Sequence, residues 1–264
     1  MNPTAQHTAS RPLAIITGAA KRVGRASALA LAKAGCDIII TYRGSKPEAE
    51  QTIADAIALG ASIEECRAIP IELGDPEAVE SLGIDLARTL ARLDVLMHNA
   101  STYERTPLAS VTPESALQAF RINALAPLLL SKHLGPLLAG SDISGGGSIV
   151  AMCDIHAMGE HGLPRSRDFA AYSMSKAALA EMVRTLAREL APRVRVNGVA
   201  PGVAAWPDSG HESDKAAQQA YLSKVPLARA GTPEECAQVV RWLALEATYL
   251  TGEIIRFDGG RNMV

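Results

Sequence analysis

The chain of 264 residues is 48% hydrophobic and 20% charged, and its formal net charge at pH 7 is −2. This is the composition of an ordinary globular chain, without the excess of positive charge that is typical of nucleic-acid-binding proteins. Its apolar runs, such as Leu125–Leu130, are far shorter than the roughly 20 residues that cross a bilayer, so we expect neither a nucleic-acid partner nor a membrane segment.

The first residues, Met1–Arg11, are polar, and we interpret them as a flexible tail before one large domain of residues 12–264. Because they lack the apolar core of a signal peptide, we expect a cytoplasmic protein. The cysteines are scattered without a C-x-x-C pair, which favours free buried thiols over disulfides or a metal site, and we predict no metal. They are Cys36, Cys66, Cys153 and Cys236.

Short β-branched and aliphatic runs alternate along the chain with longer segments of helical period. The expected strands are Leu13–Thr17, Asp37–Thr41, Ile63–Ile71, Val95–Asn99, Ser148–Asp154, Arg195–Ala200 and Ile254–Phe257. The expected helices are about Arg22–Ala34, Pro47–Leu59, Pro76–Leu93, Pro113–Leu134, Ala171–Leu190 and Pro233–Leu245. Several of these helices open with a proline, which suits a first helical turn.

This alternation predicts the α/β class, a Rossmann-like doubly wound parallel sheet of about seven strands with helices on both faces, in a single domain. Ligands of such sheets bind beyond the carboxyl ends of the strands. We therefore expect the functional residues to follow directly after strands.

The first strand runs into a glycine-rich turn and then into a helix. The turn is TGAAKRVG, residues Thr17–Gly24. Gly18 permits a tight turn and Gly24 permits close packing of the helix, whose free N-terminal amides then point at a pyrophosphate. This segment predicts a dinucleotide site.

The end of the second strand usually carries an acidic residue that selects NAD through a ribose hydroxyl. Here the sequence is TYRGS, residues Thr41–Ser45, without an acid. Arg43 offers a permanently charged, planar fork to a 2′-phosphate, with Ser45 as a further donor. Arg43 could also be a solvated surface residue. We expect NADPH as the cofactor.

Small polar residues follow the fourth strand in the sequence HNASTY, residues His98–Tyr103. Asn99 could bond backbone and ribose groups, or it could form a turn. His98 is more typical of a structural histidine than of a catalyst.

The strongest chemical signal is Tyr172, followed four residues later by Lys176 in an alanine-rich helix. Four residues make about one helical turn, so the phenol and the ammonium share a face. We expect the cation to lower the pKa of Tyr172 from about 10 and to improve it as a proton donor near neutral pH. The pair predicts general acid chemistry.

These segments, together with NGVAPG at Asn197–Gly202, resemble the short-chain dehydrogenase/reductase family from the first strand to about Gly260. The resemblance implies that Tyr172 is the proton donor, that Lys176 grips the nicotinamide ribose and that Asn123 assists them. It also implies a homotetramer packed through the helices expected at residues 113–134 and 171–190.

The cofactor-binding residues implied by the resemblance lie in the first turn, after the following strands and in the long helix. They are Gly18, Lys21, Arg22, Val23, Gly24, Tyr42, Arg43, Ser45, Glu72, Leu73, Asn99, Ala100, Ser101, Tyr172, Lys176, Pro201 and Gly202.

Three positions depart from the common family pattern. Asp154 stands where most relatives have a serine that binds the substrate carbonyl, Arg22 replaces the middle glycine of the first turn, and Ser101 replaces a glycine. These features look like the pteridine reductases, including the bacterial dihydromonapterin reductases that also reduce dihydrofolate. The resemblance implies reduction of dihydropterins or dihydrofolate to the tetrahydro form, with oxidised pterins as further candidates.

In that subgroup Tyr172 would donate the proton, and Asp154 would either replenish it or contact the pterin amine. Reduction of a C=N bond needs such a proton, because it places one on nitrogen as hydride reaches carbon. Tyr103 would stack on the flat pterin ring. The implied substrate-binding residues are Arg22, Ser101, Tyr103, Asp154 and Tyr172.

The expected substrate loop is Val203–Ser223, in which Trp206 either walls the pocket or packs locally. The segment Ile155–Ala170 is longer than is usual in the family and can reshape the pocket. Two other functions stay open. One is an NADPH-dependent carbonyl or 3-oxoacyl reductase that carries Asp154 in place of serine, and the other is a catalytically idle NADPH-binding sensor or scaffold.

Overall fold

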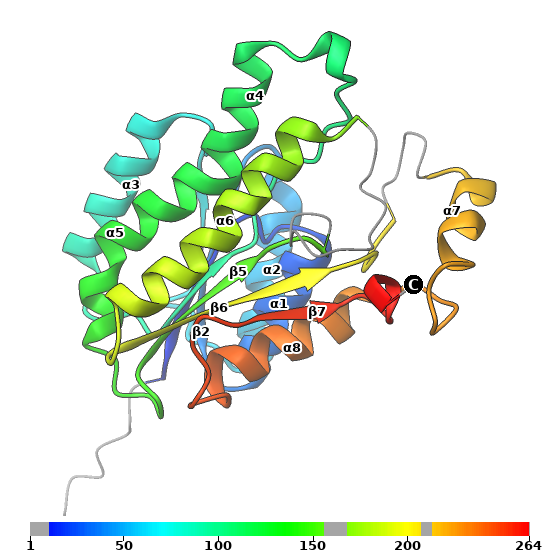
Figure 1. Ribbon diagram of the computed structural model, residues 1–264. Coiled ribbons are helices and arrows are strands. Elements are labelled where there is room, and N and C mark those ends of the chain that lie inside the picture. The colour runs from blue at the N-terminus through cyan, green and yellow to red at the C-terminus, as the bar shows by residue number, and fades with distance from the viewer. Residues whose placement is uncertain (1–10, 156–167, 207–212, 264) are drawn as a thin grey trace, which may run out of the picture.

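The computed structural model describes residues 11–155, 168–206 and 213–263. One sheet of seven parallel strands has the order β3-β2-β1-β4-β5-β6-β7, with helices on both faces (Figure 1). The strands are β1 Leu13–Ile16, β2 Asp37–Tyr42, β3 Arg67–Pro70, β4 Val95–His98, β5 Gly147–Met152, β6 Val194–Pro201 and β7 Ile254–Phe257. The predicted Rossmann-like, doubly wound sheet in a single domain is confirmed.

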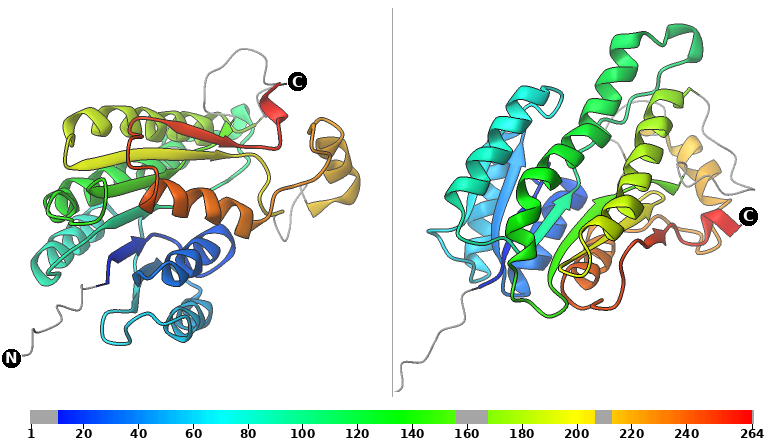
Figure 2. Two further views of the ribbon diagram at one scale, coloured as in Figure 1. Left: turned by 90° about the horizontal axis from the view of Figure 1, so that it is seen from below. Right: turned by 60° about the vertical axis from the view of Figure 1, so that its left-hand side comes forward.

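Helices α1, α2 and α8 cover one face of the sheet, and α3, α5 and α6 cover the other (Figures 1 and 2). The helices are α1 Arg22–Lys33, α2 Lys46–Ala58, α3 Pro76–Thr89, α4 Pro113–Phe120, α5 Ala126–Ala139, α6 Ala170–Glu189, α7 Lys215–Leu222 and α8 Pro233–Leu245. A π-helical turn, Arg121–Leu125, joins α4 to α5. The chain therefore stays helical beyond residue 134, where we expected it to stop.

Both faces of the central strands are buried, which explains their nearly continuous apolar sequences. In β1, Ile16 packs into the cluster under α1 and α8, and Ile15 packs into the cluster under α5 and α6. In β2, Ile40 and Ile39 divide in the same way. The alternation follows from the two-residue period of a strand.

Two of the predicted segments need correction. The strand expected at Ile63–Ile71 is shorter, because residues 63–65 form a turn. The expected substrate loop contains a helix, α7, which projects past the ends of β6 and β7 (Figure 2). Its sequence KAAQQAYL consists mostly of good helix formers, and the Asp214 side chain accepts a hydrogen bond from Ala217 N. Residues 207–212 of that loop lie outside the described residues.

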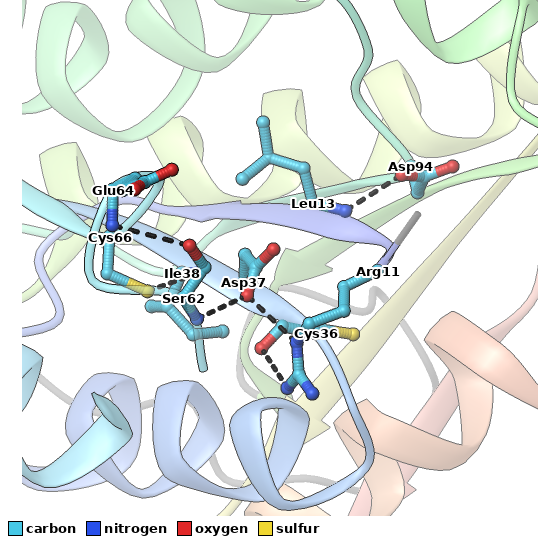
Figure 3. A network of polar contacts seen from close by, with 9 residues as sticks. All are labelled: Arg11, Leu13, Cys36, Asp37, Ile38, Ser62, Glu64, Cys66 and Asp94. Atoms are coloured by element: carbon cyan, nitrogen blue, oxygen red, sulfur yellow. Dashed lines mark hydrogen bonds and ion pairs between the residues drawn. The ribbon is translucent and has the colours of Figure 1, made fainter. Parts of the chain in front are cut away.

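Most of the expected N-terminal tail also lies outside the described residues, but Arg11 is held in place. Its Nε donates to Asp37 Oδ1 at 2.9 Å, and the same oxygen accepts from Ser62 N at 2.7 Å (Figure 3). Beside it, Cys66 Sγ accepts from Ile38 N. The four cysteines are free and buried, and no described helix is long and apolar enough to span a membrane.

A second carboxylate, Asp94, fixes the amino end of the sheet. Asp94 is fully buried, and its Oδ2 accepts from Leu13 N at 2.8 Å (Figure 3). Ser141 Oγ donates to Asp94 Oδ1 at 2.5 Å. The Arg92 guanidinium binds both carboxylate oxygens at 2.8 Å. These bonds tie β1 to the start of β4, at the edge opposite the carboxyl ends of the strands.

We expect Asp94→Asn to lower the free energy of unfolding by about 2–4 kcal/mol, because the buried amide weakens the bonds to Arg92 and Ser141. Urea unfolding at pH 7 measures this change. Asp85→Asn, which breaks an exposed ion pair with Arg88, is the matched control and should change stability by less than about 0.5 kcal/mol. Equal effects of the two substitutions would contradict the structural role assigned to Asp94.

Candidate active site

A cavity of about 740 Å³ opens at the carboxyl ends of β1, β2, β4 and β6. It brings together almost all of the residues expected to bind a cofactor. Among its lining residues are Gly18, Lys21, Arg22, Val23, Gly24, Tyr42, Arg43, Ser45, Glu72, Leu73, Asn99, Ala100, Ser101, Pro201 and Gly202. Its volume is within the usual range for small-molecule sites.

The glycine-rich turn packs directly against the residues that follow β4. A Cβ atom on Gly24 would lie 2.4 Å from Asn99 Nδ2, and one on Gly18 would lie 2.8 Å from Ala100 Cα, so larger residues cannot fit. Asn99 Nδ2 donates to Thr17 O at 3.0 Å and to Gly18 O at 2.9 Å. The bonds to backbone groups that we expected of Asn99 are thus present, and its amide holds the glycine-rich turn in shape.

Arg22 begins α1 with φ +52°, in the left-handed region that favours glycine. This backbone conformation explains why a glycine is common at the position. The N-cap residue of α1 is Lys21, whose side chain makes no hydrogen bond to the backbone amides of the first turn. These amides can therefore bind another acceptor. Lys21 Nζ lies 2.7 Å from Glu48 Oε1 on α2. The amides and the two cations suit an anion.

At the far end of the cavity, Arg43 is 73% exposed in its side chain and lies 3.8 Å from Glu72 Oε2. Glu72 is oriented by its own loop, since Oε1 accepts from Gly74 N at 2.9 Å. Ser45 lines the same region. An exposed ion pair at this distance is weak in solvent, so a phosphate can take the place of Glu72 beside Arg43.

The expected catalytic residues meet next to this cavity. Asp154 follows β5, and Tyr172 lies in the first turn of α6. The Tyr172 hydroxyl donates to Asp154 Oδ2 at 2.7 Å. Burial raises the pKa of Tyr172 well above its ordinary value, and the neighbouring Asp154 carboxylate raises it further.

The expectation that Lys176 lowers the pKa of Tyr172 is therefore wrong for this arrangement. Lys176 is buried, and its Nζ donates to Met152 O at 2.7 Å. Burial lowers the pKa of the Lys176 ammonium. Helical spacing correctly placed the two side chains in one turn but could not reveal that a carboxylate is the nearer partner of the phenol.

Asn123 lies in the π-helical turn between α4 and α5 and is fully buried. Its Nδ2 donates to Ser175 Oγ at 2.9 Å, within the Tyr172–Lys176 turn. Its Oδ1 accepts from Ser101 Oγ and from Thr102 N. Asn123 thus connects the loop after β4 to the helix that carries the tyrosine, which is consistent with the assisting role that we expected.

The predicted substrate residues are divided between two places. Tyr103 lines the cavity and stacks on Phe169, with ring centroids 4.7 Å apart. Trp206 instead packs on Tyr221 at 5.6 Å and is not among the residues that line this cavity, which favours local packing over a pocket wall. Phe169 is a site neighbour that we did not predict, although an aromatic residue three positions before Tyr172 was a signal. Residues 156–167 of the longer segment lie outside the described residues.

His98 has a structural role, and the described residues contain no metal-binding cluster. His98 is fully buried, and its Nε2 is 2.9 Å from Ser131 Oγ. Burial lowers its pKa to about 3, so it is neutral near pH 7, in agreement with a structural histidine. Within the described ranges, no group of three or more His, Cys, Asp or Glu residues is arranged to hold a metal ion.

A parallel doubly wound sheet with a glycine-rich turn and an adjacent Tyr–Lys pair defines a nucleotide-dependent oxidoreductase. The profile of a family described as Enoyl-(Acyl carrier protein) reductase matches residues 18–262. The chain belongs to the short-chain dehydrogenase/reductase family.

Several relatives cover almost the whole chain. An uncharacterized oxidoreductase of Methylorubrum extorquens is 35% identical over 94% of this chain and 96% of its own. A 3-oxoacyl-[acyl-carrier-protein] reductase of Synechocystis sp. is 32% identical over 95% of this chain and 97% of the length of that protein. The crystal structure of a putative NAD(P) dependent gluconate 5-dehydrogenase from Beutenbergia cavernae, with bound NADP, has a TM-score of 0.85 at 28% identity over 96% and 97%.

A further solved structure, a blue fluorescent protein from a metagenomic library in complex with NADPH, has a TM-score of 0.82 at 28% identity over 95% and 97% of the two chains. Cofactors of the NAD(P) type therefore accompany this fold in similar proteins. The relatives named here support the carbonyl or 3-oxoacyl reductase alternative better than the pteridine reductase subgroup, which none of them represents.

We expect Arg43→Ala to weaken NADPH binding at least tenfold, because a loss of about 1.4 kcal/mol at the 2′-phosphate already has this effect. NADH, which has no such phosphate, should bind almost as before. Titration of each reduced cofactor, followed by its fluorescence, measures both constants. Arg88→Ala, outside the cavity, is the control. Equal losses for the two cofactors would contradict the role predicted for Arg43.

Proposed function

We propose that the protein is an NADPH-dependent reductase in which Tyr172, hydrogen-bonded to Asp154, supplies the proton that accompanies hydride transfer. The observation that carries this proposal is the 2.7 Å bond between the two side chains beside the cavity that the glycine-rich turn lines. When bound, NADPH supplies a hydride from its nicotinamide C4. The glycine-rich turn would hold its pyrophosphate, and Arg43 with Ser45 would hold its 2′-phosphate.

The Tyr172–Asp154 bond limits how the proton can move. A phenol has one hydroxyl hydrogen, and here the hydroxyl donates it to Asp154 Oδ2. A protonated Asp154 would instead donate to the Tyr172 oxygen, which frees the phenolic hydrogen for the substrate. As Tyr172 gives up its proton, Asp154 replaces it, and the carboxylate that remains is reprotonated from solvent after product release.

Lys176 would position the cofactor rather than exchange protons with the substrate. One of its three N–H donors is engaged by Met152 O, and the remaining two are suited to ribose hydroxyls. Its side chain is buried, so the bond to Met152 fixes its direction. Asn123 supports this arrangement through Ser175, one residue before Lys176.

Two substrate classes have separate support. The names of several relatives favour a carbonyl compound, in particular a 3-oxoacyl thioester. Asp154 favours a C=N bond of a pterin, including dihydropterin and dihydrofolate. Once Asp154 has passed its proton to Tyr172 it is a carboxylate, which cannot donate to a carbonyl oxygen as a serine can and opposes negative charge growing there. It can accept from the ring and amino N–H groups of a pterin.

A non-catalytic NADPH-binding protein has the least support, because Tyr172, Lys176 and Asn123 are all in place.

We also propose the homotetramer implied by the family resemblance. Large apolar side chains exposed on α4, α5 and α6 support it, and among them are Leu117, Phe120, Leu128 and Met174.

A substrate panel tests the proposed function. The purified chain is mixed with NADPH and, separately, with dihydrobiopterin, dihydrofolate, a simple ketone and S-acetoacetyl-N-acetylcysteamine, and the loss of NADPH absorbance is followed. Turnover of the pterins alone would support the C=N reductase, and turnover of the ketone or thioester alone would support the carbonyl reductase. If NADPH absorbance stays unchanged with every compound of the panel, both assignments are contradicted.

With the best substrate of the panel, Tyr172→Phe should lower kcat by roughly 10²–10⁴, the usual contribution of a positioned acid. Binding of NADPH should persist, because the ring remains and only the hydroxyl is lost. Steady-state rates and a cofactor titration measure the two effects. The mechanism fails if the variant keeps most of its turnover when hydride transfer is rate-limiting, as judged by a deuterium isotope effect with labelled NADPH.

Asp154→Ala should lower dihydropterin reduction steeply while NADPH still binds. The substitution also removes one of the influences that raise the pKa of Tyr172. Because the acid must be protonated, activity falls as pH rises through this pKa, so the alkaline fall of kcat/KM should move to lower pH in the variant. Asp154→Ser restores a hydroxyl donor and should favour ketones relative to pterins. A pterin reductase whose rate and pH profile survive Asp154→Ala would disprove the relay.

A further inference from the structure

Lys21, in the glycine-rich turn, contacts both the main cavity and helix α2. It lines the cavity together with Arg43 and Ser45. Its Nζ lies 2.7 Å from Glu48 Oε1, and the two side chains are 54% and 44% exposed. At this distance the ammonium and the carboxylate form a charge-assisted hydrogen bond. One of the cations of the cavity therefore already has a carboxylate partner.

Contacts between α2 and the glycine-rich turn fix the place of this ion pair. Thr52, four residues after Glu48 and fully buried, donates to Glu48 O at 2.9 Å and lies with Oγ1 3.3 Å from Ala20 O of the turn. Farther along α2, Asp55 forms an ion pair with Arg25 of α1. Residues four apart share a face of a helix, so Glu48 faces the turn as Thr52 does.

The same end of α2 carries the residue expected to help hold the 2′-phosphate. Ser45 is the N-cap of α2, and its side chain makes no hydrogen bond to the helix. Glu48 follows three residues later, in the first turn, which is a distance of about 5 Å along a helix axis. The positive end of the helix dipole favours any negative group there. A carboxylate of the chain and a phosphate of the cofactor are thus suited to the same surroundings.

The charge of Glu48 opposes that of the phosphate. The hydrogen bond from Lys21 lowers the pKa of the Glu48 carboxyl, and the backbone amide of Glu48 lowers it further. Glu48 is therefore ionised at neutral pH. A phosphate monoester carries a charge of about −1.5 to −2 at pH 7, so two negative groups compete for one ammonium. NADH, with a hydroxyl in place of this phosphate, takes little part in the competition.

We propose that Glu48 is a specificity-determining residue that competes with the 2′-phosphate of NADPH for the Lys21 ammonium and so restrains the preference for NADPH over NADH. The inference rests on the proposed function, because it assumes that NADPH binds in the main cavity with its 2′-phosphate near Arg43 and Ser45. NADP⁺ carries the same phosphate, so the competition lowers the affinity for the oxidised cofactor as well.

The test is a titration of the purified chain with NADPH and with NADH, followed by the fluorescence of each reduced cofactor. Glu48→Gln keeps the length of the side chain and its tendency to form a helix but removes the charge. It should lower the Kd of NADPH roughly three- to tenfold and change the Kd of NADH by less than about twofold.

Two further variants separate competition for Lys21 from a general change of charge. Glu50→Gln removes the same charge from the same helix, where Glu50 lies 3.6 Å from Lys46, and should change both constants by less than about twofold. In a Lys21→Met background, most of the effect of Glu48→Gln on NADPH should disappear. Thermal unfolding of each variant confirms that it is folded.

The inference is overturned if Glu48→Gln leaves the Kd of NADPH unchanged or raises it, since a higher Kd would mean that Glu48 orients Lys21 toward the phosphate. Equal tightening of NADH, or an effect that persists in full without Lys21, would also overturn it. The proposed function fails separately if NADPH binds but is not oxidised with any compound of the panel. If the parent protein does not bind NADPH, both are overturned.

Discussion

The close approach of the glycine-rich turn to the end of β4 is the constraint on which the site depends. Gly24 leaves just enough space for the Asn99 side chain, whose amide then binds the carbonyl oxygens of Thr17 and Gly18. With the turn fixed in this way, the start of α1 points along the cavity. On the other side, Asn123 binds Thr102 of the loop after β4 and Ser175 of α6, so this loop is connected both to the glycine-rich turn and to the helix that carries Tyr172.

Most of this arrangement could be predicted from the sequence because it depends on local rules. Strand–turn–helix order, the glycines of the first turn and the polar residues after strands placed nearly every expected cofactor residue on one cavity. Helix α7 was missed because the segment was assigned to a loop by resemblance, against the helix-forming tendency of its alanines and glutamines. The strand that contains β3 was predicted too long, because the sequence pattern did not show that residues 63–65 form a turn.

The electrostatics of Tyr172 could not be predicted from spacing. The i, i+4 rule places Lys176 one turn away, but the direction of its Nζ depends on Met152 O, which belongs to β5 and is distant in sequence. The partner of the phenol, Asp154, likewise comes from the end of a strand. Tertiary contacts therefore reversed the expected direction of the pKa shift of Tyr172. Phe169 and its contacts with the loop after β4 also depend on tertiary structure.

Asp154 changes the charge of the site as well as its hydrogen bonding. With a serine at this position, the Lys176 ammonium would be the main charge near the phenol, and a positive field favours a reaction that builds negative charge on oxygen. Asp154 offsets this field, as seen in the raised pKa of Tyr172 and in its opposing influence on the pKa of Lys176. Once the proposed relay leaves Asp154 ionised, its carboxylate offsets the Lys176 ammonium, and the site then stabilises an alkoxide less than a site with serine would. Overall similarity to 3-oxoacyl reductases is a similarity over the whole chain, whereas Asp154 is the one side chain bonded directly to the hydroxyl of Tyr172, the predicted proton donor.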